Sequence, residues 1–196
     1  MDIKIQELNP NMALKYIDFF EHRAFCDGNI NKGCYCVWHH WTEKHEYERS
    51  QRPIEERPFC KRNYAIELIE QNKLHGFVAC DENEIVGFCN ADLKDNYFRF
   101  DRENNSNSWI GIDENDKVLA LVCFTIAPNY RGKGIAKKLL KYACEYAKKN
   151  GYDYIESYPS DGEFNPNNCC GNRSMYESQD FTIININDGI IARKKL

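Results

Sequence analysis

A short turn with two glycines and two basic residues is the part of the sequence best suited to chemistry. It spans residues 131–134, R-G-K-G, and follows residues 118–126, an apolar run typical of a buried strand. A helical pattern follows, with apolar residues on one face at Ile135, Leu139, Leu140, Ala143 and Ala147. The start of a helix presents free backbone N–H groups and the positive end of the helix dipole. The sequence therefore predicts an anion-binding turn.

The glycine spacing separates this turn from two other phosphate-binding motifs. A P-loop would continue with Lys and then Ser or Thr, whereas Gly134 is followed by Ile135. A dinucleotide-binding turn would have a third glycine where Lys137 stands, and it would lie in the first βα unit of the chain. Residues 131–136 instead have the form R-x-x-G-x-A.

This turn and the I-A-P-N-Y of residues 126–130 resemble the central motif of the GNAT superfamily of acyl-CoA-dependent N-acetyltransferases. That motif is Q/R-x-x-G-x-G/A after a strand that ends in V-x-P-x-Y. The resemblance implies acetyl-CoA as the cofactor. Its pyrophosphate would be held by the turn residues Arg131, Gly132, Lys133, Gly134, Ile135 and Ala136. Its pantetheine arm would lie along Phe124, Thr125 and Ile126, with the Phe124 N–H facing the thioester oxygen.

Residues 172–181, N-R-S-M-Y-E-S-Q-D-F, resemble the later GNAT segment, in which an Asn leads a short helix to Y-E-x-x-G-F. The resemblance implies that Asn172 contacts pantetheine and that Tyr176 donates a proton to the leaving thiolate as general acid. A tyrosine hydroxyl suits this role because its ordinary pKa lies near that of a thiol. A core position for Tyr176 is the alternative. Asp180 stands where the family has Gly.

A general base is not evident from the sequence, because residues 118–126 carry no carboxylate or histidine. Glu156, near the end of the next predicted strand, could accept the amine proton directly or through water. His39 and His40 have ordinary pKa values suited to the same task. A solvated side chain is the alternative for each of the three.

The segment between Cys26 and Cys60 is rich in cysteine, tryptophan and histidine. Cys34 and Cys36 precede the His39-His40 pair, but the second well-spaced ligand pair of a structural zinc site is missing, so we predict no metal site. Pocket lining or core is the favoured interpretation of this segment, and a metal or redox-sensitive thiols are the two alternatives. By resemblance to GNAT relatives, the wall of the acceptor pocket would include Trp38, His39, Asn90 and Cys123.

Length and composition narrow the class of protein. A chain of 196 residues with 42% apolar and 29% charged residues suits one globular domain, numbered 1–196. The net charge of −4, without a basic tract, argues against a nucleic-acid partner. Since the sequence has no membrane-length apolar run and no signal peptide, the ten cysteines are expected in the reduced cytoplasm. A monomer or a homodimer is expected.

Mixed α/β elements must position these residues. The expected strands and hairpins occupy residues 2–7, 74–93, 118–126, 152–158 and 181–194. The expected helices begin at Asn9-Pro10 and at Thr42 and cover residues 62–73, 135–149 and 172–178. Residues 94–117 and 161–170 are expected to be loops, with Trp109, Ile110 and Ile112 of the first loop docking back onto the domain. This order matches the GNAT fold, which implies a mostly antiparallel sheet that splays after the fourth strand. Residues 1–75 would form the acceptor side and residues 76–196 the acetyl-CoA-binding core.

These features favour an N-acetyltransferase that transfers an acetyl group from acetyl-CoA to a primary amine of a small molecule or peptide. The transfer would be a direct attack in a ternary complex. A catalytically weak acyl-CoA-binding or sensor protein with the same fold is the alternative, because no base is evident. A metal- or redox-responsive protein centred on residues 26–40 is a third possibility.

Overall fold

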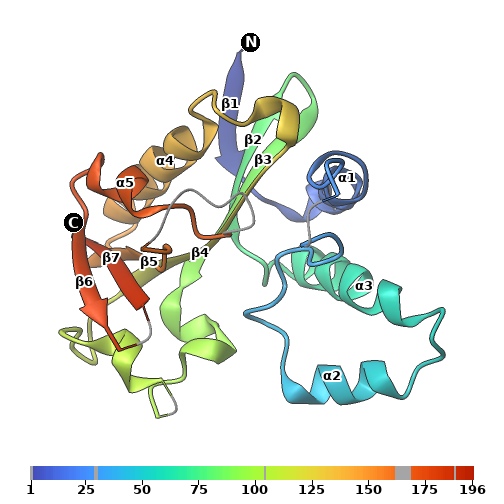
Figure 1. The fold of residues 1–196 in the computed structure, drawn as a ribbon, viewed down its shortest axis with the longest axis horizontal. Helices are drawn as coiled ribbons and strands as arrows, with labels where there is room; N and C mark the ends of the chain where they lie inside the picture. Colours follow the sequence, from blue (N-terminus) through green and yellow to red (C-terminus); the bar gives the residue numbers. More distant parts are fainter. Residues whose placement is uncertain (1, 29–30, 104, 162–168, 188) are drawn as a thin grey trace.

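A single mixed sheet of seven strands forms the centre of the computed structural model, which describes residues 2–28, 31–103, 105–161, 169–187 and 189–196 (Figure 1). The strand order is β1-β2-β3-β4-β5-β7-β6, and only the β4–β5 pair is parallel. The strands are β1 (Ile3–Glu7), β2 (Gly76–Asp81), β3 (Glu84–Leu93), β4 (Val118–Ile126), β5 (Tyr154–Ser157), β6 (Thr182–Ile186) and β7 (Gly189–Lys195). The mixed, mostly antiparallel sheet predicted from the sequence is confirmed.

Helices cover both faces of this sheet. They are α1 (Ala13–Asp18), α2 (Glu43–Ser50), α3 (Arg57–Glu70), α4 (Ile135–Lys149) and α5 (Arg173–Glu177). A 3-10 turn capped by the Asn9 side chain leads into α1, and Thr42 caps α2, as the sequence predicts. The helix predicted at residue 62 begins earlier, at Arg57, because the first turn of a helix accommodates Pro58.

The two faces of the sheet bury different clusters. The apolar stripe of α4 packs with α5 on one face, against residues of β1 to β4 such as Phe77, Leu119 and Leu121. Helices α1 and α3 cover the other face together with the segment around Tyr35 and Val37. Figure 1 shows α1, α2 and α3 gathered on the side of the sheet away from α4.

Residues 94–117 differ from the surface loop that we predicted. They contain three 3-10 turns, Lys94–Asn96, Phe98–Phe100 and Ser106–Trp109. Their aromatic side chains pack against β4 residues in a third apolar cluster, made of Tyr97, Phe100, Trp109, Ile112, Val118, Ala120 and Val122. The docking of Trp109 and Ile112 is as predicted, whereas the polar composition of the segment concealed the burial of Tyr97 and Phe100. The predicted loop at 161–170 and the hairpin turn at 187–189 fall partly outside the described residues.

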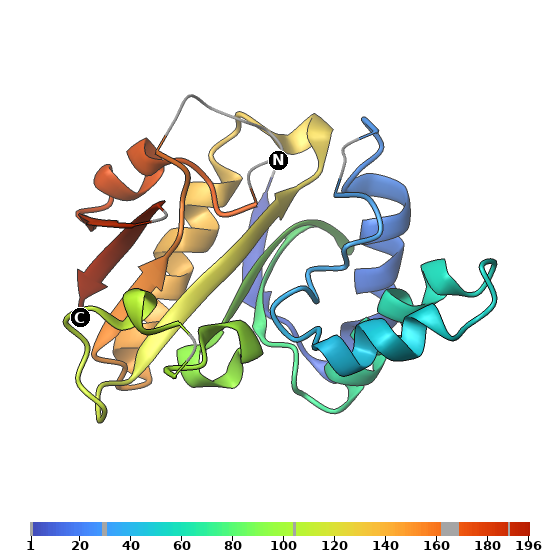
Figure 2. The ribbon, with the colours of Figure 1, turned by 60° about the horizontal axis from the view of Figure 1, so that its bottom comes forward.

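The sheet splays between β4 and β5. The parallel pairing ends at Leu121 with Ser157, so the half of β4 from Val122 to Ile126 extends beyond β5 (Figure 2). This opening is the splay after the fourth strand that the sequence predicts.

A β-bulge changes the direction of the β4 side chains at this opening. Cys123 pairs with Asn90 of β3, whereas the next pair joins Leu121 with Ala91 and leaves Val122 as the extra residue. Val122 therefore shares a face with Ala120, and Cys123 lies on that same face against the α1 and α3 side. The bulge thus turns the Cys123 side chain toward α1 and α3, beside the opening between β4 and β5.

A buried ion-pair cluster joins the 94–117 segment to the far end of the sheet. Glu156 of β5 is fully buried and binds both Lys94 and Arg193, with Lys94 Nζ at 2.7 Å from Glu156 Oε2. Lys94 Nζ also donates to the Ser108 carbonyl at 2.5 Å and lies 4.2 Å from the Trp109 ring centroid. Burial lowers the pKa of Lys94, and the Glu156 carboxylate opposes that shift.

Replacing Glu156→Gln should destabilise the fold by about 3–5 kcal/mol, because it leaves two buried cations without a counter-charge. Urea denaturation at neutral pH measures this loss. Glu177→Gln is the matched control, because its ion pair with Arg173 is 46% exposed on the Glu177 side and should contribute at most about 1 kcal/mol. Equal stability of the two variants would contradict the structural role of Glu156.

Candidate functional site

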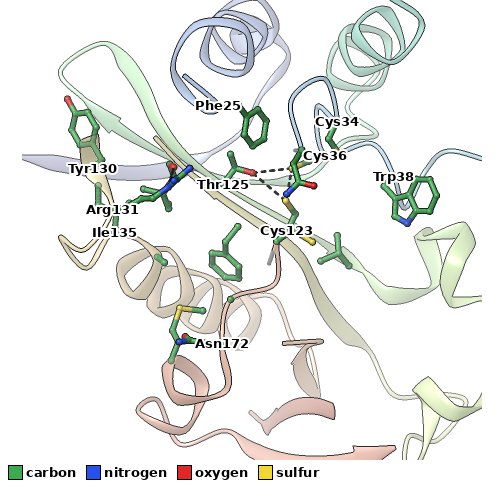
Figure 3. Close-up of a pocket in the computed structure, with 18 of the residues that line it drawn as sticks. Phe25, Cys34, Cys36, Trp38, Cys123, Thr125, Tyr130, Arg131, Ile135 and Asn172 are labelled. Carbon is green, nitrogen blue, oxygen red and sulfur yellow. Dashed lines mark hydrogen bonds between the residues drawn. The ribbon is translucent and has the colours of Figure 1, made fainter. Parts of the chain in front are cut away.

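A cavity of about 870 Å³ opens where β4 leaves β5 (Figure 3). Most of its lining comes from four segments: β4 from Val122 to Ile126, residues 130–137 at the start of α4, residues 31–39, and residues of the 169–175 segment. Phe25 and Lys61 complete the described lining. Its walls are mainly apolar and aromatic, with thiols and a few cations between them. A pocket of this size and character suits a small molecule or a cofactor arm.

The turn before α4 has the conformation that anion binding requires. Gly132 and Gly134 have φ angles of +73° and +77°, a region that side chains with a Cβ rarely adopt. Nothing lies within 4 Å of a Cβ built on either glycine, so the turn is open. Gly134 is the N-cap of α4 and supplies no side-chain cap, which leaves the first-turn amides available to a ligand.

Arg131 holds this turn in place. Its Nε donates to the Ile126 carbonyl at 3.0 Å, and its Nη1 lies 2.5 Å from Asp27 Oδ2. The predicted turn residues that line the cavity are Arg131, Gly132, Gly134, Ile135 and Ala136. Lys133 does not line it, and its Nζ lies 5.2 Å from the Tyr130 ring centroid.

The free edge of β4 differs in one respect from the prediction. Phe124, Thr125 and Ile126 line the cavity as expected. The Phe124 N–H, however, donates to the Cys169 carbonyl, and Cys170 Sγ lies 3.2 Å from the Val122 carbonyl. The 169–170 segment thus occupies the hydrogen-bonding edge that we assigned to a thioester, because buried backbone groups need a partner.

Tyr176 lies in the core, so the structure does not support it as the general acid. Its side chain is fully buried, and its hydroxyl lies 2.7 Å from Ser157 Oγ and 2.6 Å from the Cys170 carbonyl oxygen. Burial raises the pKa of Tyr176 well above its usual value. The neighbouring Asn172, Ser174 and Met175 do line the cavity.

Glu156 is likewise unsuited to the role of base. It does not line the cavity, and Lys94 and Arg193 take up its carboxylate. His39 does line the cavity, and its buried Nδ1 makes no hydrogen bond within the described part of the chain. Burial lowers the pKa of both His39 and His40 to about 4, so both rings are neutral at pH 7.

Thiols surround the middle of the cavity. Cys36 Sγ lies 2.7 Å from Cys123 Sγ, and both sulfurs lie near Thr125 Oγ1, at 3.5 and 3.4 Å. Cys34 and Cys169 also contribute to the lining. Among the described residues no group of three or more His, Cys, Asp or Glu could hold a metal ion.

Asn90 supports the acceptor wall from behind. It is fully buried and does not line the cavity, contrary to our expectation, whereas Trp38, His39 and Cys123 do. Asn90 Nδ2 donates to the Cys36 carbonyl at 2.8 Å, and Asn90 Oδ1 accepts from the Tyr97 hydroxyl at 2.7 Å. The cross-strand partner of Cys123 therefore fixes the backbone of Cys36.

Several lining residues were not predicted. Phe25, Lys61 and Cys169 reach the cavity from segments far apart in the sequence. None belongs to a motif, so the sequence carries no signal for their meeting.

A model of the acetyltransferase (GNAT) family matches residues 35–166, more than half of the chain. The chain belongs to the GNAT acetyltransferase family. The search of curated proteins finds no match.

Solved GNAT-like structures share the fold across the whole chain. The PaiA N-acetyltransferase of Thermoplasma acidophilum, in complex with coenzyme A, has a TM-score of 0.53 at 18% identity, with 100% of both chains covered. The Drosophila melanogaster polyamine N-acetyltransferase has a TM-score of 0.56 at 9% identity, and a Staphylococcus aureus N-acetyltransferase has 0.55 at 15%. Coverage is 100% of both chains for the Drosophila protein, and 100% of this chain and 99% of the other for the S. aureus protein. At these identities the likeness concerns the fold alone.

Within the described residues of this GNAT chain, no helix combines the length and the apolar character needed to cross a membrane.

The two buried histidines, His39 and His40, should make the stability of this GNAT chain decrease as the pH is lowered. Their pKa values are about 4 in the folded state and 6.5 when unperturbed, so between these values the unfolded chain binds more protons. Their contribution is fully present above pH 6.5 and is lost as the pH falls toward 4.

Between pH 6.5 and pH 4.5 the free energy of unfolding should fall more in the wild type than in the double variant His39→Gln/His40→Gln, by at least about 1 kcal/mol. Denaturant titrations at several pH values measure this difference. His22→Gln, at an exposed position, serves as the control and should follow the wild type. Parallel pH curves for all three proteins would show that the histidines are not buried in neutral form.

Proposed function

We propose that this protein transfers an acetyl group from acetyl-CoA to a primary amine of a small molecule or peptide by direct attack in a ternary complex. The observation that carries the proposal is the continuity of one cavity. It runs from the open turn at the start of α4, along the free edge of β4, to an end lined by Trp38 and His39. A cofactor and an acceptor could meet there end to end.

The turn suits the diphosphate of coenzyme A. Gly134, Ile135 and Ala136 present backbone amides at the positive end of a 15-residue helix, and Lys137 adds a positive charge to the same wall. The space beside Gly132 and Gly134 is open, and a side chain at either position would project into it. The absence of a side chain lets phosphate oxygens approach the backbone closely. The residues present therefore fit the group.

The pantetheine arm would run along Phe124, Thr125 and Ile126 and reach Asn172 on the opposite wall. To pair with β4 it has to displace the Cys169 carbonyl from the Phe124 N–H. That N–H would then face the thioester oxygen and stabilise the negative charge that develops on it. One such donor is typically worth about 2.7–4 kcal/mol in the transition state.

His39 is the best-placed group to accept the proton of the amine. Its ring is neutral at pH 7, it lines the cavity, and its Nδ1 makes no hydrogen bond to the described residues. Its orientation is held by ring contacts with Phe100 and Tyr97, at 5.4 and 5.7 Å between centroids. Its low pKa makes it a weak base, so an acceptor whose amine loses its proton readily suits it best.

Two observations favour the alternative, an acyl-CoA-binding protein without turnover. The Phe124 N–H is already bonded to Cys169, and the Tyr176 hydroxyl is buried away from the cavity. Binding of acetyl-CoA without transfer to any amine in a broad panel would select this alternative.

We further propose a single-domain cytoplasmic protein that acts as a monomer or homodimer, without nucleic-acid or membrane partners. Residues 1–75 would supply most of the acceptor side, and residues 76–196 the cofactor side. The net charge of −4 supports the absence of a nucleic-acid partner. The contribution of both segments to one cavity supports the division into two sides.

Replacing Gly134→Val should weaken coenzyme A binding by roughly tenfold or more, since the side chain would stand over the first amides of α4. Calorimetric titration of acetyl-CoA measures this loss, and release of coenzyme A with an amine panel measures turnover. Gly151→Val is the matched control, because Gly151 has a similar φ of +69° but ends α4 outside the cavity.

Both substitutions impose comparable backbone strain, of about 1–2 kcal/mol. A loss of binding in the Gly134 variant alone therefore reports on the turn. If the wild type does not bind acetyl-CoA, or if the Gly134 variant binds acetyl-CoA as tightly as the wild type does, the proposal is wrong.

A further inference from the structure

The end of the cavity farthest from Arg131 is where an acceptor would lie. Figure 3 shows Cys34 and Trp38 across the cavity from Tyr130, Arg131 and Ile135. His39 and Lys61 belong to the same lining, and Lys61 lies beside this end because its ammonium faces Trp38. These side chains come from the 31–39 segment and from α3, on the face of the sheet away from α4.

This end carries positive charge without a matching carboxylate. No Asp or Glu occurs among the described residues that line the cavity. The cationic side chains in the described lining of the whole cavity are Lys32, Lys61, Arg131 and Lys137. Arg131 and Lys137 belong to the α4 turn, and so to the diphosphate end, whereas Lys61 belongs to the acceptor end. A pocket that held a polyvalent cation would need carboxylates instead.

The Lys61 ammonium is available to a ligand. Its Nζ lies 5.8 Å from the ring centroids of both Trp38 and Trp41, and it forms no ion pair or hydrogen bond within the described ranges. The acidic group that faces it from α2 is Glu46, whose carboxylate is engaged by Arg49 and by Trp41 Nε1 at 3.1 Å. Lys61 is half-buried, so its charge is only partly screened by water.

Arg99 adds a second cation behind Trp38. Its guanidinium carbon lies 3.7 Å from the Trp38 ring centroid, and its Nε donates to the Trp38 carbonyl at 3.0 Å. The indole therefore packs on Arg99 and lies near Lys61, with 49% of Trp38 still exposed. It offers an apolar surface beside the free ammonium.

We propose that the acceptor is an amine that also carries a carboxylate, of the amino-acid type, and that Lys61 binds this carboxylate. The inference rests on the proposed acetyl transfer and names its substrate class. The carboxylate would neutralise the unmatched charge of Lys61, while the apolar part of the acceptor would lie on Trp38. The amine would then point toward His39 and the Cys36–Cys123 wall.

The experiment compares matched acceptors. Phenylalanine, phenylalanine amide and phenylethylamine share one side chain, and the corresponding tryptophan and methionine series provide two more. Release of coenzyme A from acetyl-CoA measures kcat/KM for each compound. In at least one series we expect the amino acid to exceed both its amide and its decarboxylated form by roughly tenfold or more.

Variants of Lys61 test the assigned residue. Lys61→Met, which removes the charge and keeps most of the length of the side chain, should raise KM for the amino acid and abolish the preference. Lys61→Glu should reverse the preference toward the decarboxylated amine, and Lys61→Arg should restore most of the wild-type pattern. Lys73→Met, at an exposed position beyond the end of α3, is the control and should behave as wild type.

Acetyl-CoA titrations of each variant separate the two proposals. The carboxylate inference is wrong if the wild type binds acetyl-CoA but acetylates simple amines better than amino acids, and if the Lys61 variants show the same order. Acetyl transfer itself would stand in that case. Wild type that binds no acetyl-CoA overturns the proposed function itself. If acetyl-CoA binds without turnover, calorimetry of the amino acids in the presence of coenzyme A decides, and equal or absent binding in wild type and Lys61→Met overturns the inference.

Discussion

The early end of the β4–β5 pairing is the constraint on which the rest of this structure depends. A strand in the middle of a sheet has two edges to satisfy, and from Val122 onward one edge of β4 has no neighbouring strand. The chain supplies local partners there, the Cys169 carbonyl and the Cys170 thiol. The cavity exists because these two residues cover the edge without filling the space that a full strand would occupy.

Features that depend on local periodicity could be predicted from the sequence. The α4 turn, with its glycines at positive φ, and the amphipathic stripe of α4 follow from residues close together in the chain. Tyr176 and Glu156 could not be assigned in the same way, because the direction of a side chain on a short helix or strand depends on its tertiary neighbours. Ser157 and Cys170 hold the Tyr176 hydroxyl, and Lys94 and Arg193 hold the Glu156 carboxylate. All but Cys170 lie 19 or more residues from the side chain that they hold.

The acceptor side shows the same limit more strongly. The β-bulge at Val122 turns Cys123 toward the α1 and α3 face, and no residue type near it signals this change. Asn90 has the polarity of a ligand-binding residue, yet the bulged register places it behind Cys36 as a structural tether. Lys61 and Arg99 flank Trp38 from two separate elements, so the positive character of this end is visible only in three dimensions.

The 31–39 segment also stores conformational energy. Tyr35 and Cys36 are consecutive residues with φ of +48°, an arrangement that typically costs about 1–2 kcal/mol for each residue that is not glycine. The Tyr16 hydroxyl bonds the Tyr35 carbonyl at 3.0 Å, and Asn90 bonds the next carbonyl, so buried tethers maintain the unfavourable backbone. Substitution of Tyr16 or Asn90 would remove one of these two hydrogen bonds and let residues 35 and 36 leave the left-handed conformation. The shape of this wall of the cavity can therefore change through single substitutions outside the lining, without any change in the sheet.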